Sequence, residues 1–136
     1  MKKLFLRSGG QWLFLLLLLA SRSAGPLYAQ SSSDATFLST LGQLRTAEFD
    51  AKDKIIDQVA QTAHPSVRPV LTAFLEGRLY YRNQDERIFL VKAGEEDSTT
   101  LDLIDPLTLK SAGSAPAESL TKIGTNNSLR LSLIHI

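Results

Sequence analysis

The sequence FLEGRLYYR at residues 74–82 decides the fold, because the spacing of apolar residues changes within it from helical to extended. Before Gly77, apolar side chains recur every three or four residues, which is typical of amphipathic helices. After Gly77, short apolar runs are separated by clusters of turn residues, as in β-hairpins. The sequence therefore predicts an α+β protein, with a helical unit over residues 30–77 and a small β-rich part of the same domain over residues 78–130.

Three short helices are expected before Gly77, each with one apolar face. In the second helix, Asp50 is expected to cap the amino end and Asp53 to complete a capping box. His64-Pro65 is expected to end this helix, because proline disfavours a helical conformation in the residue before it. The third helix is expected to begin near Ser66 and to end at Gly77. The three expected apolar faces are Phe37, Leu38, Leu41 and Leu44; Ile55, Ile56, Val59, Ala60 and Ala63; and Val70, Leu71, Phe74 and Leu75.

The β-rich part is expected to form a small antiparallel sheet. Residues 79–82 and 87–92 predict a hairpin, and residues 101–104 predict a third strand. Residues 111–117 are small and include a proline, so a flexible loop is expected there.

The helical unit resembles one unit of an α-solenoid, which cannot bury its apolar face alone. It is therefore expected to share one core with the sheet. The helical unit and the sheet together are expected to form an incomplete domain. The candidate core residues are Phe74, Leu79, Tyr81, Ile88, Leu90 and Leu103.

The amino end has the three-part layout of a secretory signal: a basic start, an apolar run over residues 12–20 and a polar stretch. Nine helical residues span roughly 13 Å, which is much less than the ~30 Å hydrocarbon core of a membrane. The sequence therefore predicts a signal peptide over residues 1–29, cleaved after Ala29. An uncleaved signal anchor is the alternative, and in both cases the remainder of the chain is exported.

Composition narrows the function classes. The chain has 136 residues, enough for about one domain, and no cysteine, which excludes disulfides, thiolate metal sites and a thiol nucleophile. It has 15 Lys+Arg and 14 Asp+Glu. Four of the basic residues fall in the predicted signal, so the remainder has 11 basic and 14 acidic residues, a net charge of about −3. This balance gives no electrostatic reason to expect a nucleic-acid partner.

Residues that carry chemistry are few. His64 is the one credible catalytic histidine, but a position beside proline at a helix end favours a structural role. The acidic residues 95–97 lack the spaced oxygen ligands and fixed glycine of a calcium loop, and a solvated loop is expected. Tyr80 and Tyr81 alternate on a strand, so one is expected in the core and the other on the surface, where it could stack on a ligand. Asn126-Asn127-Ser128 matches a glycosylation sequon.

No catalytic set can be assembled from these residues. The sequence contains no Gly-rich phosphate loop, Ser/His/Asp set or paired-carboxylate cleft, so we expect no enzyme and no catalytic, cofactor-binding or metal residues. A small secreted hydrolase that uses His64 is the rival hypothesis.

The last six residues, 131–136, resemble the in-frame translation of a transposon adapter used in sequencing libraries, CTG TCT CTT ATA CAC ATC. On this interpretation His135 has no chemical role, and the native frame continues past Arg130. The alternative is a terminal β-strand, since these residues alternate between apolar and polar.

Seven short segments, in this order along the chain, resemble the exported amino-terminal extension of the urea-type ABC transporter permease, in the branched-chain amino acid permease family. The segments are residues 48–52, 64–65, 74–82, 88–90, 105–108, 122–123 and 126–130. The sequence departs from the family's usual pattern at Leu109-Lys110, where glycine more often follows the threonine, and at Gly124, where a basic residue is common.

The resemblance implies a fragment of an importer for urea or a related small amide, with no transport pathway in this segment. Its implied partners are a second permease subunit, two ATPase subunits and a periplasmic binding protein. The full-length protein would lie in the inner membrane, held by a part beyond this sequence, with this segment in the periplasm. The alternative is a stand-alone periplasmic module that binds a protein partner through the acidic loop and the tyrosine strand.

Overall fold

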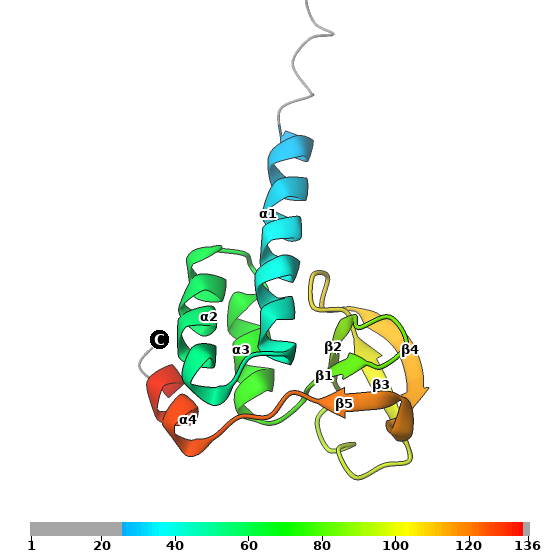
Figure 1. Ribbon diagram of the computed structural model, residues 1–136. Helices are drawn as coiled ribbons and strands as arrows, with labels where there is room; N and C mark the ends of the chain where they lie inside the picture. The colour runs from blue at the N-terminus through cyan, green and yellow to red at the C-terminus, as the bar shows by residue number, and fades with distance from the viewer. Residues whose placement is uncertain (1–25, 135–136) are drawn as a thin grey trace, which may run out of the picture. The chain divides into compact units, whose positions relative to one another are not determined.

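The computed structural model describes residues 26–134, and the chain divides into two compact units, Met1–Ser32 and Ser33–Ile136. Of the first unit, only the short stretch 26–32 is described, as the beginning of a helix. The basic start and apolar run of the predicted signal lie outside the described residues, as does His135. The second unit carries the sheet and all further helices (Figure 1).

Three helices and a short 3-10 turn precede the sheet, and one helix follows it. Helix α3 packs against strands β1 and β2 as well as against α2, so helices cover one face of the sheet. Helix α4 contacts both α2 and α3. The bounds are α1 Pro26–Gly42, η1 Gln43–Arg45, α2 Phe49–Gln61, α3 Val67–Leu75 and α4 Asn127–Ile134.

Helix α3 has the predicted bounds: Ser66 precedes it, and Gly77 follows it with a φ of 74°. This left-handed conformation favours glycine and turns the chain out of the helix into the first strand. The change of structure within residues 74–82 is therefore confirmed.

Two predictions about helix α2 are wrong. The residue at its amino-terminal cap is Glu48, and Asp50 lies within the first turn, so the predicted capping box does not form. The helix ends at Gln61, before His64-Pro65, and Ala63 adopts a left-handed φ of 52°. The hydroxyl of Thr62 donates to the carbonyl of Val59 at 2.7 Å, and the backbone amide of Thr62 donates to the same carbonyl at 3.2 Å, which closes the last turn.

The predicted apolar face of the first helix is confirmed for three of its four residues. Phe37, Leu41 and Leu44 are fully buried, although Leu44 lies in the 3-10 turn that follows α1. Leu38 is 39% exposed, so its assignment to that face is wrong. A helix turns about 100° per residue, so residues 37 and 38 cannot both point to the centre of the core.

The α+β class is confirmed, but the sheet has five antiparallel strands, in the order β4-β3-β2-β1-β5, and not the three that were predicted. It is open, with β4 and β5 at its edges. The chain runs through the first four strands as a meander and then returns to pair β5 with the free edge of β1. The bounds are β1 Leu79–Arg82, β2 Ile88–Val91, β3 Thr100–Ile104, β4 Ser111–Pro116 and β5 Leu120–Lys122.

Strand β4 occupies the segment that was predicted to be a flexible loop, and that prediction is wrong. Its pairing with β3 shifts register between Asp102 and Ile104, and Gly113 has a φ of 90°, which together indicate a β-bulge. Small side chains have low strand propensity, so it is the neighbouring strand that makes this segment extended. The bulge also protects an edge strand from pairing with other chains.

The helices and the sheet share one core, as predicted, but a second apolar cluster that was not predicted covers the opposite face of the sheet. The helix-side cluster joins Leu79, Ile88 and Leu90 to buried residues of the helices, and Tyr81 packs against it. Leu103 belongs instead to the outer cluster, because it points to the opposite face of its strand. The outer cluster consists of Tyr80, Phe89, Val91, Leu101, Leu103, Ala115 and Leu120, with Ala117 of the 3-10 turn η2 (Ala117–Ser119) packed against it.

Residues 131–134 lie in helix α4, so the alternative expectation of a terminal β-strand is wrong for these residues. The side chain of Asn126 accepts a hydrogen bond from the amide of Leu129 at 2.8 Å, which caps the helix. Leu129 and Leu133 are buried in the helix-side cluster, one helical turn apart.

Candidate functional site

His64 lies at the corner between α2 and α3 and is enclosed on three sides. The backbone amide of Ser66 donates to its Nδ1 at 3.1 Å, and its Nε2 lies 3.0 Å from Oδ1 of Asp34. The ring also stacks on Phe37, with 4.4 Å between ring centres. Because Nδ1 accepts a hydrogen bond, the proton is on Nε2 and is donated to Asp34.

The contacts of His64 give it a structural role, because they hold helix α1 against the α2–α3 corner. Its side chain is 7% exposed, and both ring nitrogens have partners within the protein. The adjacent Ser66 extends this network, since its hydroxyl donates to the carbonyl of Leu107 at 2.8 Å. The corner is thereby also tied to the loop between β3 and β4.

The carboxylates of the predicted acidic loop fold the loop itself. Glu95 accepts a hydrogen bond from the amide of Asp102 at 2.9 Å, and Glu96 accepts one from the amide of Gly94 at 3.1 Å. Hydrogen bonds from backbone amides, its own and that of Gly94, lower the pKa of Glu96. Within residues 26–134, no three histidine or acidic side chains are grouped closely enough to hold a metal ion.

The two tyrosines of β1 point to opposite faces of the sheet, but the prediction that one of them lies on the surface is wrong. Tyr80 is 6% exposed and belongs to the outer cluster. Tyr81 is partly buried against the helix-side cluster, with the guanidinium of Arg45 5.7 Å from its ring centre. The ring of Tyr80 is therefore covered, whereas that of Tyr81 is partly buried between the helix-side cluster and Arg45.

The predicted sequon lies at the start of α4. Its first residue, Asn126, is the helix cap described above, so its side-chain oxygen is already in use. A glycan on Asn126 would have to share this amide group with the cap.

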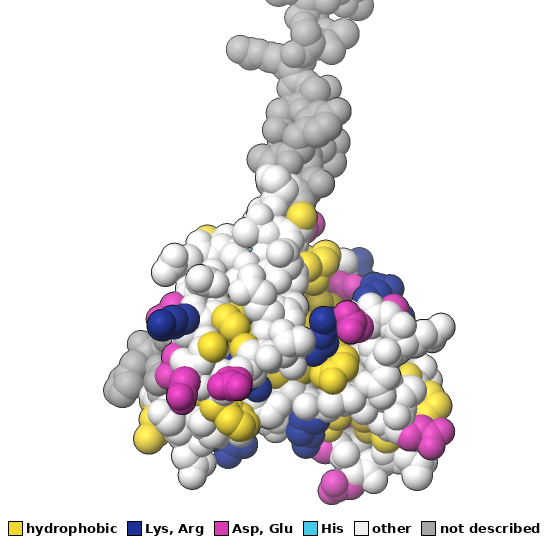
Figure 2. Space-filling view, in the orientation of Figure 1, with side chains coloured by type: hydrophobic (Ala, Val, Ile, Leu, Met, Phe, Trp, Pro, Cys, Tyr) yellow, Lys and Arg dark blue, Asp and Glu magenta, His cyan; other side chains and the backbone are white. Residues whose placement is uncertain are grey.

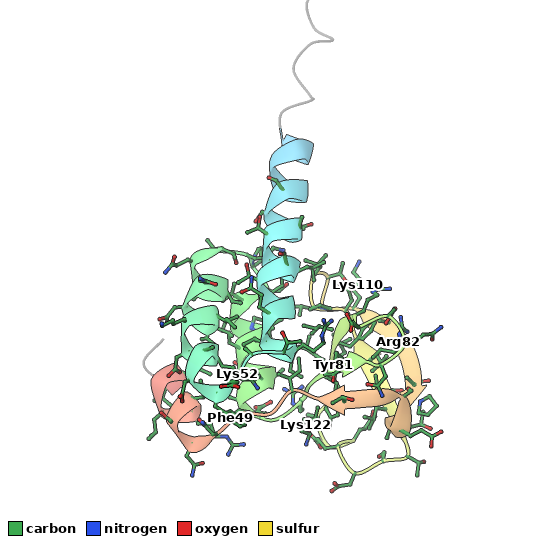
Figure 3. All side chains as sticks on the ribbon, viewed as in Figure 1. Phe49, Lys52, Tyr81, Arg82, Lys110 and Lys122 are labelled. Carbon is green, nitrogen blue, oxygen red and sulfur yellow. The ribbon has the colours of Figure 1, made fainter. Side chains whose placement is uncertain are left out.

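Sequence reasoning missed a buried lysine at the amino end of α2. Lys52 is 6% exposed, and its Nζ donates to the carbonyl of Gly124 at 2.7 Å and lies 4.8 Å from the ring centre of Phe49 (Figure 3). Burial lowers the pKa of this ammonium group. The sequence pattern could have revealed its burial, because Lys52 falls on the apolar stripe of the helix, three residues before Ile55 and four before Ile56.

Sequence reasoning also missed a surface on the outer side of the sheet, where three cations lie over two aromatic rings. We call it the cationic face: Arg82, Arg87 and Lys122, with Tyr80 and Phe89 beneath them. The guanidinium carbons of Arg82 and Arg87 are 5.0 and 5.3 Å from the ring centre of Phe89. The ammonium of Lys122 is 5.5 Å from the ring centre of Tyr80.

The wider surface has mixed charge. In Figure 2, basic and acidic side chains alternate across the visible side, and neither sign forms a broad field.

None of the helices within residues 26–134 is both long and apolar enough to cross a membrane.

Comparison with known proteins gives no relative: no protein-family model, curated protein or solved structure matches the chain.

Proposed function

We propose that the chain is the exported amino-terminal segment of a permease subunit of an ABC importer for urea or a related small amide. The observation that carries the proposal is the backbone at Leu109, whose φ of 56° lies in the left-handed region. This region favours glycine, and glycine is the residue that the permease family more often has after the threonine. Leu109 thus departs from the family pattern in residue type, but its backbone has the left-handed conformation that glycine favours.

The second departure, at Gly124, is also compatible with the family pattern. A Cβ added to Gly124 would meet only the ring of Phe49, at 3.8 Å, which is ordinary van der Waals contact. The backbone of Gly124 therefore does not require glycine, and a residue with a side chain is compatible with this position.

The resembling segments also contact one another in space. Residues 74–82 and 88–90 supply the paired strands β1 and β2. Lys52 donates to Gly124, which links the segment 48–52 to the chain just after residues 122–123. Segments that pair in this way form one framework, which supports a common origin better than scattered similarity would.

In this proposal the segment is a framework domain in the periplasm, and transport takes place in a membrane part encoded beyond Arg130. Its partners are a second permease subunit, two ATPase subunits and a periplasmic binding protein. Within the described residues the histidine and the carboxylates of the acidic loop make contacts that hold the fold together.

Sequencing the genomic locus past the codon for Arg130 tests the proposal. We expect an open frame that encodes several apolar spans of about 20 residues each, the length that crosses a membrane. A frame that continues without such spans would refute the permease assignment.

A second candidate function is a stand-alone exported interaction module. The cationic face favours it, because the head groups of Arg87 and Lys122 form no hydrogen bond or ion pair with any other residue of the described part of the chain. A stop codon shortly after Arg130 at the same locus would support this candidate over the permease.

A further inference from the structure

We infer that the cationic face binds an acidic polypeptide segment. The inference does not depend on the permease assignment. It rests on the register of strands β2, β1 and β5, and on the cations of these strands whose head groups have no hydrogen-bonded or ion-paired acceptor among the described residues. It gives a surface and a partner chemistry, and neither requires the permease assignment to be correct.

The strand register brings the five side chains together. Tyr80 pairs with Phe89 on one side and with Lys122 on the other, so these three residues form a row across β2, β1 and β5. The amide of Arg82 donates to the carbonyl of Arg87 at 2.9 Å, which places these two residues opposite each other in the next row. Side chains two residues apart on a strand share a face, so both rows lie on the outer side of the sheet.

The rings hold the cations and are not themselves open to a ligand. Tyr80 is 6% exposed and Phe89 is 2% exposed. A cation–π contact stabilises the charge but uses none of its hydrogen-bond donors. The N–H groups of the cations therefore remain available to an acceptor from outside.

One of the three cations already has a partner. Arg82 donates from Nε to Oδ1 of Asp85 at 2.9 Å and pairs with the second carboxylate oxygen as well. Arg87 and Lys122 are both exposed, and among residues 26–134 neither head group has a hydrogen-bonded or ion-paired acceptor. Glu96 is close enough to Lys122 for that charge to lower the pKa of its carboxyl, but it accepts its hydrogen bond from Gly94.

Carboxylates are the ligands that fit these free donors. A guanidinium matches a carboxylate with two parallel hydrogen bonds, and the ammonium of Lys122, on the other side of β1 from Arg87, can pair with a second carboxylate of the same chain. Single-stranded nucleic acid would need exposed rings on which bases stack, and both rings here are covered. An anionic membrane presents a broad charged surface, whereas the visible side of this molecule carries charges of mixed sign (Figure 2). A flexible acidic chain can instead reach the two free cations individually.

Binding of fluorescein-labelled poly-L-glutamate to the protein made from the complete sequence tests the inference by fluorescence anisotropy. The double variant Arg87→Gln, Lys122→Gln removes the two free cations. The matched control is Lys54→Gln, Arg68→Gln, which removes two exposed cations of the helical part.

We expect the first variant to weaken binding about 2- to 30-fold, since it removes two exposed ion pairs that contribute about 0.2–1 kcal/mol each. The control should change binding less than twofold, and raising NaCl from 50 to 200 mM should weaken binding to the unaltered protein.

Equal losses in the two variants, or no binding of poly-L-glutamate by the unaltered protein, would overturn the inference. So would tighter binding to oligo-dT or to phosphatidylserine vesicles than to poly-L-glutamate. If the double variant fails to fold, Lys122→Gln alone provides the same comparison against Lys54→Gln. The charge reversal Lys122→Glu should additionally give binding to poly-L-lysine.

Discussion

Nε2 of His64 lies 3.0 Å from Oδ1 of Asp34, a residue 30 positions earlier in the chain. The imidazole also accepts a hydrogen bond from the backbone amide of Ser66, and it stacks on Phe37. One side chain therefore joins helix α1 to the α2–α3 corner. The histidine that was the most conspicuous catalytic candidate in the sequence is therefore part of the framework.

Replacing His64 with alanine should lower the free energy of unfolding by about 2–4 kcal/mol, because it removes two hydrogen bonds and a buried ring. Urea denaturation of the variant and the unaltered protein measures the change. Ser39→Ala, on an exposed position of α1, is the control and should have little effect. A loss below about 0.5 kcal/mol, within the range of surface substitutions, would contradict the structural role.

Replacing Leu109 with glycine should stabilise the protein by about 0.5–1 kcal/mol. The left-handed conformation costs a non-glycine residue roughly 1–2 kcal/mol, and the greater freedom of glycine in the unfolded chain offsets part of the gain. Leu109 is 40% exposed, so little packing is lost with its side chain. The neighbouring Lys110→Gly, at a residue without positive φ, should be neutral or destabilising. Thermal unfolding of both variants distinguishes relief of strain from a general effect of glycine.

The Asp85 carboxyl should remain ionised to unusually low pH. Its hydrogen bonds with Arg82 lower its pKa from 3.8 to about 2. Because the folded pKa is depressed, the stabilising contribution is complete above the unfolded value of 3.8 and is lost as the pH falls toward 2. Carbon-13 NMR titration of the carboxyl measures the pKa directly. In Arg82→Gln the pKa should return toward its ordinary value, and an unchanged titration would show that Arg82 is not the cause.

Replacing Lys52 with alanine should destabilise the fold by about 1–3 kcal/mol, since the buried stem and the hydrogen bond to Gly124 are both lost. Lys52→Met keeps the stem and should cost less.

Burial of the ammonium also predicts a pH dependence. Because burial lowers the pKa of Lys52 below 10.5, the unfolded chain binds the proton more tightly, and stability should rise with pH through the folded pKa. This rise should be absent in Lys52→Met. Urea unfolding of both proteins between pH 8 and pH 10.5 measures the difference, and an identical pH profile would argue against a desolvated ammonium.

Much of the fold could be predicted from local sequence patterns. The end of α3 at Gly77 and the hairpin that follows it were correct, because a glycine stop and apolar runs of strand length are properties of the chain itself. Strands β4 and β5 could not be predicted in this way. Residues 111–116 have little strand propensity of their own, and they become extended because they pair with the edge of β3 that β2 leaves unpaired.

The candidate site was less predictable than the fold. Arg82 and Lys122 are 40 positions apart in the sequence, and no local pattern places them together. They become neighbours only when the chain crosses from β4 to the far edge of the sheet and pairs β5 with β1.

The sequence by itself determined the α+β class, the position at which helices give way to strands, and most of the buried faces, because hydrophobic periodicity and turn residues act over a few positions. Tertiary structure alone decided that His64 meets Asp34, that Leu103 packs on the outer face of the sheet, and that three cations gather over two rings. These relationships depend on long-range pairing, whose geometry is fixed only when the whole sheet and its helices have assembled.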